Sequence, residues 1–144
     1  DYYCDWSSDV CSSDLPSEGT ALPPSRVPHA DPYRSYDAHV RIFDRRKPLV
    51  PLLDHDVGGG IWRLKWHASR SERLLVAAMH GGFRVVDFEG LGGSESVEPT
   101  THAKFDGHES LAYGVDWSGG QTEKGEDVVA SCSFYDHTVH VWSC

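Results

Sequence analysis

The sequence predicts an all-β fold built from short strands that recur along the chain. One turn-and-strand pattern returns three times within the 144 residues, and an aromatic strand recurs between its copies. Gly, Ser and Asp separate the strands, as is typical of tight turns. No apolar run approaches the roughly 20 residues that a membrane-spanning helix needs, so we expect no membrane insertion.

The turn-and-strand pattern places Asp or a small polar residue in a turn and follows it with alternating apolar residues. Its three copies occupy residues 36–44, 79–87 and 135–143. Alternation of apolar and polar side chains is typical of a strand with one buried face. Each copy therefore predicts a turn followed by a half-buried strand.

Two more elements recur in the same order. Aromatic strands are expected at residues 61–67 and 112–118, and apolar strands at 74–78 and 128–132. A period of about 40–45 residues with four strands per unit is typical of WD repeats. The sequence therefore predicts a fragment of a WD-repeat β-propeller, with about two and a half blades of a presumed seven. Polar stretches at 90–101 and 119–127 lengthen the second interval, and we expect them to be loops.

The N-terminal residues differ in composition from the rest. Residues 5–15, DWSSDVCSSDL, are similar to a translated sequencing-library adapter, so we predict that residues 1–15 are not native. Without their four aspartates the net charge changes from −9 to −5, and of the four cysteines only Cys132 and Cys144 remain. Two cysteines are too few for a disulfide framework. A mildly acidic chain does not predict a nucleic-acid partner.

The predicted organisation has five parts. They are an adapter-like leader at 1–15, an irregular linker at 16–34, the end of one blade at 35–54, a second blade at 55–98 and a third blade at 99–144. One blade cannot bury both faces of its sheet, and propellers need roughly 4–8 blades to close. We therefore expect the isolated chain to be unfolded, or to aggregate through an exposed edge.

The third unit carries the residues of a buried hydrogen-bond chain. Gly107-His108 precedes a strand, Asp136 lies in a tight turn and Trp142 ends the following strand. Because buried polar groups need partners, we predict one network from these side chains and a serine. Its members are His108, Ser131, Asp136 and Trp142, with Ser133 as an alternative to Ser131. The earlier units lack it, since Phe43 and Val86 stand where the third has Trp142.

Four strings are more specific than the repeat. They are GGIWRLKWH at 59–67, LLVAAMHGGF at 74–83, SLAYGVDWS at 110–118 and ASCSFYDH at 130–137. In this order, and within a stretch of roughly 35–144, they resemble the diphthine methyl ester hydrolase family. The resemblance implies a cytoplasmic enzyme that removes the methyl ester from diphthine on translation elongation factor 2 during diphthamide synthesis. A non-catalytic WD-repeat scaffold or adaptor, for example in vesicle trafficking, is the alternative.

Ester hydrolysis needs an activated water or nucleophile and a donor for the developing oxyanion. Three residues at predicted turns are candidates for general-base or positioning roles: His80, Asp136 and His137. Asp136 is better explained as a framework residue, whereas the two histidines match no framework role. No motif fixes the catalytic residues, no cofactor is implied, and we expect the isolated chain to be inactive.

Three other patterns favour structural interpretations. Ser131-Cys132-Ser133 lacks the Gly-x-Ser-x-Gly elbow of a hydrolase nucleophile. The glycines at 58–60 are similar to an S-adenosylmethionine-binding loop, but they lead into a predicted strand and not a helix. His137 and His140 are three apart on a strand and point to opposite faces, so no metal site is expected.

Four rings are available for a cage around the trimethylammonium group of the implied substrate, bound by cation–π contact. They are Trp62, Trp66, Tyr113 and Tyr135. Core packing is the simpler explanation of most of them.

Overall fold

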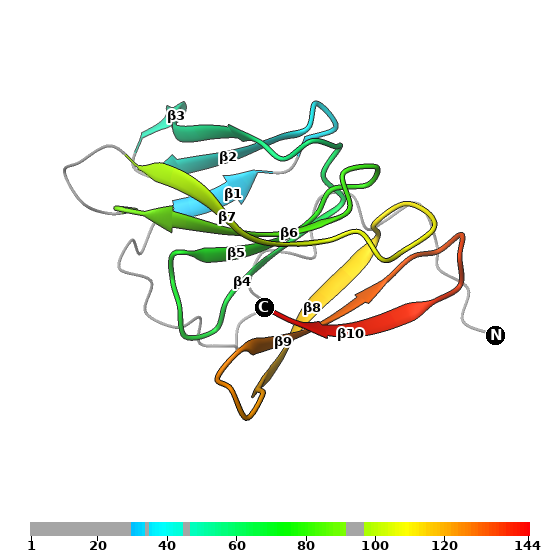
Figure 1. Ribbon diagram of the computed structural model, residues 1–144. Helices are drawn as coiled ribbons and strands as arrows, with labels where there is room; N and C mark the ends of the chain where they lie inside the picture. Colours follow the sequence, from blue (N-terminus) through cyan, green and yellow to red (C-terminus); the bar gives the residue numbers. More distant parts are fainter. Residues whose placement is uncertain (1–29, 34, 45–46, 92–96) are drawn as a thin grey trace, which may run out of the picture.

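The computed structural model describes residues 30–33, 35–44, 47–91 and 97–144. The adapter-like leader and most of the predicted linker lie outside the described residues. Within them the chain has ten strands and no helix, grouped in three sheets (Figure 1). The all-β prediction is confirmed.

Each sheet is an antiparallel meander. The first contains β1 (Ala30–Tyr33), β2 (His39–Asp44) and β3 (Lys47–Asp56). The second contains β4 (Arg63–Trp66), β5 (Arg73–Ala77), β6 (Phe83–Glu89) and β7 (Glu98–Phe105). The third contains β8 (Gly114–Gln121), β9 (Asp127–Cys132) and β10 (Val139–Ser143). Successive three- and four-stranded meanders packed face to face are the arrangement of part of a β-propeller.

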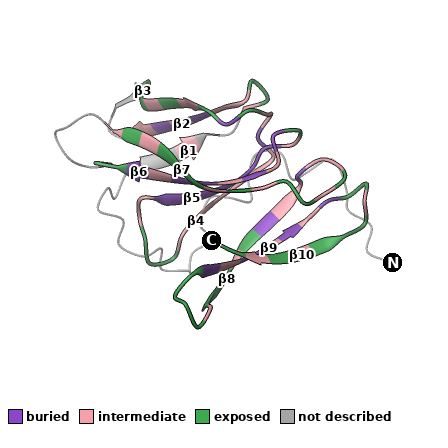
Figure 2. Cartoon of the chain, in the orientation of Figure 1, coloured by how far each residue is buried: buried purple, intermediate pink, exposed green. Residues whose placement is uncertain are grey.

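The second sheet is covered on both faces, as the burial of its strand β5 shows. All five of its residues are buried (Figure 2), and successive side chains of a strand point to opposite faces. Leu74 and Val76 belong to a core that includes Val40 of β2. Leu75 and Ala77 belong to a second core, shared with the third sheet. The uninterrupted apolar string at 74–78 therefore reflects a strand covered from both sides.

Two stretches predicted as irregular contain strands. β1 lies inside the predicted linker at 16–34 and pairs along β2. β7 begins inside the predicted loop at 90–101 and pairs along β6. β7 is the outermost strand of its sheet and its side chains are mostly exposed, so it has no apolar alternation for a sequence pattern to detect. Backbone pairing alone defines it.

The sheets defined by backbone hydrogen bonds do not begin and end where the repeat units of the sequence do. The predicted boundary between the second and third blades, at 98/99, falls at the start of β7, which belongs to the second sheet. The loop predicted at 119–127 overlaps the end of β8. A repeat can be cut anywhere along its period, whereas sheet membership follows hydrogen bonding.

Candidate functional site

One end of the three sheets collects the turns that hold the candidate residues. Connections between antiparallel strands alternate between two ends, so β1–β2, β3–β4, β5–β6, β7–β8 and β9–β10 all turn at the same end (right side of Figure 1). We call it the loop end. His80, Asp136 and His137 all lie there, in the β5–β6 and β9–β10 turns.

His108 joins a loop, a strand and a turn of the third sheet. Its Nδ1 lies 2.9 Å from Asp136 Oδ2, and its Nε2 lies 3.0 Å from Ser131 Oγ. Trp142 Nε1 donates to the same serine oxygen at 3.2 Å. Ser131 therefore supplies the hydroxyl of a continuous hydrogen-bonded chain. The nearby Ser133 Oγ is buried and has no hydrogen-bond partner among the described residues.

The Asp136 carboxylate is fully engaged by this framework. The backbone N–H and the hydroxyl of Thr138 donate to Oδ1 at 2.9 and 2.7 Å, and the Glu109 N–H donates to Oδ2 at 3.2 Å. Burial raises the pKa of the Asp136 carboxyl, but the hydrogen bonds from Thr138 and His108 outweigh it and lower the pKa to about 2. The geometry thus supports a framework role for Asp136.

Asp136, His108 and Ser131 stand in the order of acid, base and nucleophile in a serine-hydrolase triad. Two features argue against nucleophilic catalysis. Ser131 is 2% exposed, and its oxygen already accepts the indole N–H of Trp142. Since a nucleophilic oxygen must reach its substrate, these hydrogen bonds hold strands together instead.

A hollow of about 520 Å³ opens at the loop end, where the second and third sheets meet. Trp62 precedes β4 and Tyr113 precedes β8, and their ring centroids lie 4.9 Å apart, edge to face. Phe134 and Tyr135, in the β9–β10 turn, lie 6.3 and 5.9 Å from the Tyr113 ring. We call this space the aromatic hollow; its lining includes Trp62, Arg63, Tyr113, Phe134 and His137.

Three of the four rings considered for a cage therefore lie together. Trp62 and Tyr113 line the aromatic hollow, and the Tyr135 ring lies 5.9 Å from that of Tyr113. Trp66 packs 6.1 Å from Phe88 in the core shared with the first sheet. Phe134 and Arg63 belong to the same place and are not predicted from the sequence. Phe134 stands beside Tyr135 in the string ASCSFYDH, which was the available signal.

His137 enters the aromatic hollow from an unusual backbone conformation. Its φ is 55°, in the left-handed region that is uncommon for residues other than glycine, although His is enriched there. Ala38 occupies the equivalent position in the β1–β2 turn and has a φ of 71°. The left-handed conformation is thus a property of the turn, and it directs His137 to the hollow.

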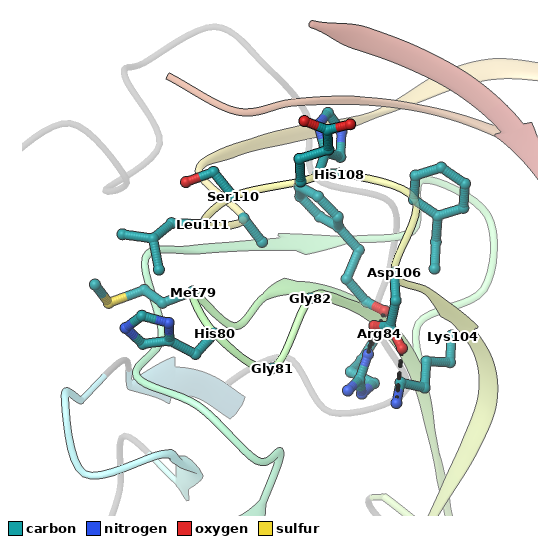
Figure 3. Close-up of a pocket in the computed structure, with 14 residues that line it drawn as sticks. Met79, His80, Gly81, Gly82, Arg84, Lys104, Asp106, His108, Ser110 and Leu111 are labelled. Atoms are coloured by element: carbon teal, nitrogen blue, oxygen red, sulfur yellow. Dashed lines mark hydrogen bonds and ion pairs between the residues drawn. The ribbon is translucent and has the colours of Figure 1, made fainter. Parts of the chain in front are cut away.

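A second hollow of about 450 Å³ lies at the loop end beside the β5–β6 turn (Figure 3). His80 lines one side of it. On the other side, Asp106 contacts Arg84 at 3.0 Å and Lys104 at 2.7 Å. Burial raises the pKa of Asp106, but the two cations outweigh it and lower the pKa. His80 and His137 thus line different hollows and do not form a pair.

The described residues include no group of three or more His, Cys, Asp or Glu side chains arranged to hold a metal ion. His137 lines the aromatic hollow, whereas the His140 ring lies 4.5 Å from that of His108. The glycines at 58–60 lie between β3 and β4, and a strand follows them. Among the residues that the structure describes, no helix has the length and apolar character to cross a membrane.

A charged cluster at the opposite end joins the second and third sheets. Arg73 of β5 donates twice to Asp87, at 2.7 Å each, and once to Asp127 of β9 at 3.0 Å. The Asp127 side chain is 3% exposed and also contacts Arg70 at 2.9 Å and Gln121 at 3.0 Å. Burial raises the pKa of Asp127, but these partners lower it overall. Sequence patterns do not reveal the cluster, because its members come from different repeat units.

No protein-family model matches the chain. It is 36% identical over 110 residues to a diphthine methyltransferase homolog from Dictyostelium discoideum, which covers 75% of this chain and 30% of that protein. It is 40% identical over 84 residues to the diphthine methyltransferase of Homo sapiens, over 58% of this chain and 18% of that protein. The Saccharomyces cerevisiae protein of the same name is 33% identical over 127 residues, with 75% and 30% covered.

The chain spans less than a third of the length of these curated relatives. Within that span, relatives from three distant organisms carry the name diphthine methyltransferase and are 33%, 36% and 40% identical to this chain. The chain belongs to the diphthine methyltransferase family.

Proposed function

We propose that the protein acts in diphthamide biosynthesis as a carboxylic ester hydrolase that removes the methyl ester from diphthine on translation elongation factor 2. The observation that carries the proposal is the similarity to relatives whose names specify diphthine. Their names specify methyl transfer. Within this chain, however, the glycines before β4 lead into a strand, whereas the phosphate- or cofactor-binding loops of this kind lead into a helix. In the proposed reaction, water attacks the ester.

His137 is the proposed general base, because it lines the aromatic hollow, whose lining also includes Arg63. The imidazole takes a proton from water as the water oxygen attacks the ester carbonyl, and the Arg63 guanidinium faces the oxyanion that develops. The carbon–methoxide bond then breaks, and the proton passes to methoxide, which leaves as methanol. His80, in the second hollow, is the rival candidate.

The test incubates the full-length protein with elongation factor 2 that carries the methylated intermediate. Methanol release is expected without any added methyl acceptor, and in ¹⁸O-labelled water the label should enter the new carboxylate. Absence of release would contradict the proposal and favour a non-catalytic scaffold. Appearance of the methyl group on an added acceptor would favour methyl transfer.

Two substitutions locate the base. His137→Asn should lower turnover by roughly 10²–10⁴-fold, and asparagine tolerates the left-handed backbone of this turn. His102→Gln is the control, because His102 is an exposed residue of the outer strand β7, 3.7 Å from Asp87. Loss of turnover in His80→Gln but not in His137→Asn would assign the base to the second hollow.

A further inference from the structure

We infer that the Ser133 hydroxyl positions the water that attacks the ester in the proposed hydrolysis. The inference deepens the proposed function and rests on it, since that reaction gives the water its role. Its structural basis is separate: Ser133, whose buried hydroxyl has no hydrogen-bond partner among the described residues, lines the aromatic hollow.

The Ser133 hydroxyl is unusual in its surroundings. Ser133 follows the last residue of β9 and is 4% exposed. Among the buried side-chain nitrogen and oxygen atoms of the described residues, its Oγ is the one that makes no hydrogen bond. Burying a hydroxyl without a partner destabilises a fold, and an alanine would fit the same space without that penalty. A hydrogen bond to an occupant of the hollow explains why a hydroxyl is kept there.

The other hydroxyls among the described residues of the lining already have partners. Thr138 Oγ1 donates to Asp136 Oδ1 at 2.7 Å and lies 3.1 Å from His108 Nδ1. Burial, and a hydrogen bond with Tyr135, raise the pKa of the Tyr113 hydroxyl. Ser133 thus supplies the hydroxyl that can bond to a molecule inside the hollow.

Ser133 and His137 stand near the two ends of the β9–β10 turn. The Ser133 N–H donates to Thr138 O at 3.3 Å, so Ser133 lies against the residue that follows His137. Both residues line the aromatic hollow. The low exposure of Ser133 admits only a small molecule to its hydroxyl, and water meets that limit. In the proposed arrangement one water molecule bridges the imidazole and the hydroxyl.

The bridging water is oriented by its two hydrogen bonds. One O–H donates to His137, the other donates to Ser133 Oγ, and a lone pair is left to attack the ester carbonyl carbon. As the new carbon–oxygen bond forms, the first proton moves to the imidazole, which later passes it to methoxide. The second proton stays on the new carboxyl group until solvent removes it. Ser133 keeps its own proton and fixes only the direction of attack.

The experiment compares Ser133→Ala with the wild type in the full-length protein, using methanol release from elongation factor 2 that carries the methylated intermediate. The substitution should lower kcat about 10–100-fold and leave KM within about twofold, because Ser133 contacts the water and not the ester. Urea unfolding should show no loss of stability. Ser143→Ala is the matched control and should leave kcat unchanged, because it removes an exposed hydroxyl at the opposite end of β10, 2.9 Å from Glu126.

A double variant gives a readout that a purely structural role would not change. If Ser133 and His137 act on the same water, Ser133→Ala should lower turnover less than about threefold in the His137→Asn background. Fully multiplicative losses would overturn the inference, as would an unchanged kcat in Ser133→Ala alone. An acyl group found on Ser133 by mass spectrometry after an acid quench would also overturn it, because Ser133 would then be the nucleophile.

Wild-type activity separates this inference from the proposed function. Methanol release by the wild type, with an unchanged kcat in Ser133→Ala, would reject the role of Ser133 and retain the hydrolase. Absence of release by the wild type would reject the hydrolase, and the water-positioning role with it.

Discussion

Ser131 and Ser133 are two buried hydroxyls, two positions apart, with different surroundings. Ser131 Oγ lies between His108 Nε2 and Trp142 Nε1, whereas Ser133 Oγ has no hydrogen-bond partner in the described part of the chain. Ser131→Ala leaves two ring nitrogens unpaired, so we expect it to lower the free energy of unfolding by about 1–3 kcal/mol. Ser133→Ala should leave that free energy unchanged or raise it. Urea unfolding of the full-length protein measures both.

Turnover provides the second readout for the same pair. If Ser131 is a framework residue, the folded fraction of Ser131→Ala retains its turnover. A loss of turnover with unchanged stability would instead identify Ser131 as a nucleophile, since the triad-like order of Asp136, His108 and Ser131 would then be catalytic.

The same two serines show how far single residues are predictable. The sequence identifies His108, Asp136 and Trp142 because WD repeats in general place residues of these types at fixed positions. It cannot choose between Ser131 and Ser133, because residues two apart on a strand point to the same face. The end of β9 at Cys132 makes the difference: Ser131 lies within the strand and Ser133 begins the turn.

The connection between β3 and β4 depends on a close backbone approach at Gly59. A Cβ there would lie 2.2 Å from Ala78 O and 2.6 Å from Gly81 N, both backbone atoms at the β5–β6 turn. Since neither atom can swing away, we expect Gly59→Ala to destabilise the protein by roughly 1–3 kcal/mol. At Gly120 a Cβ would meet only Ser118 Oγ, at 3.6 Å, so Gly120→Ala should stay within about 0.5 kcal/mol. Thermal unfolding compares them, and equal effects would contradict the steric explanation.

Strands were predictable where their sequence carries an apolar pattern, as β5 and the mostly exposed β10 do. The apolar string at 74–78 predicts β5, because both faces of that strand are covered. β7 is polar and mostly exposed, and it contains Pro99, which is typical of an outer strand. β1 is likewise an edge strand, with Pro32. Such strands exist because a neighbour supplies hydrogen bonds, and this information is not local in the sequence.

At the scale of the whole molecule, the repeat predicts separate sheets but not the contacts between them. The aromatic hollow combines Trp62 of one unit with Tyr113 and Phe134 of the next. The charged cluster at the opposite end combines Arg73 with Asp127, 54 residues later. Both depend on how neighbouring sheets are placed. Residue types alone therefore indicated three rings at or beside the hollow and no member of the cluster.

The charged cluster supplies a test of how firmly the second and third sheets are joined. Arg73→Met removes the guanidinium shared by Asp87 and Asp127, and leaves the 3%-exposed Asp127 side chain with Arg70, Gln121 and His67. Breaking a buried pair from one side costs about 3–5 kcal/mol, and we expect about 2–4 kcal/mol here because three partners remain. Arg84→Gln is the control, since its partner Asp106 is 51% exposed and such pairs contribute up to about 1 kcal/mol.

The double variant Arg73→Met, Asp127→Asn decides the cause of that loss. With the carboxylate gone, no buried charge lacks its partner, so part of the stability lost in Arg73→Met should return. Urea unfolding of the four proteins in the cycle measures the coupling. Strictly additive losses would mean that Arg73 acts through Asp87 within its own sheet, and that other contacts, such as the apolar core around Leu75 and Val129, join the two sheets.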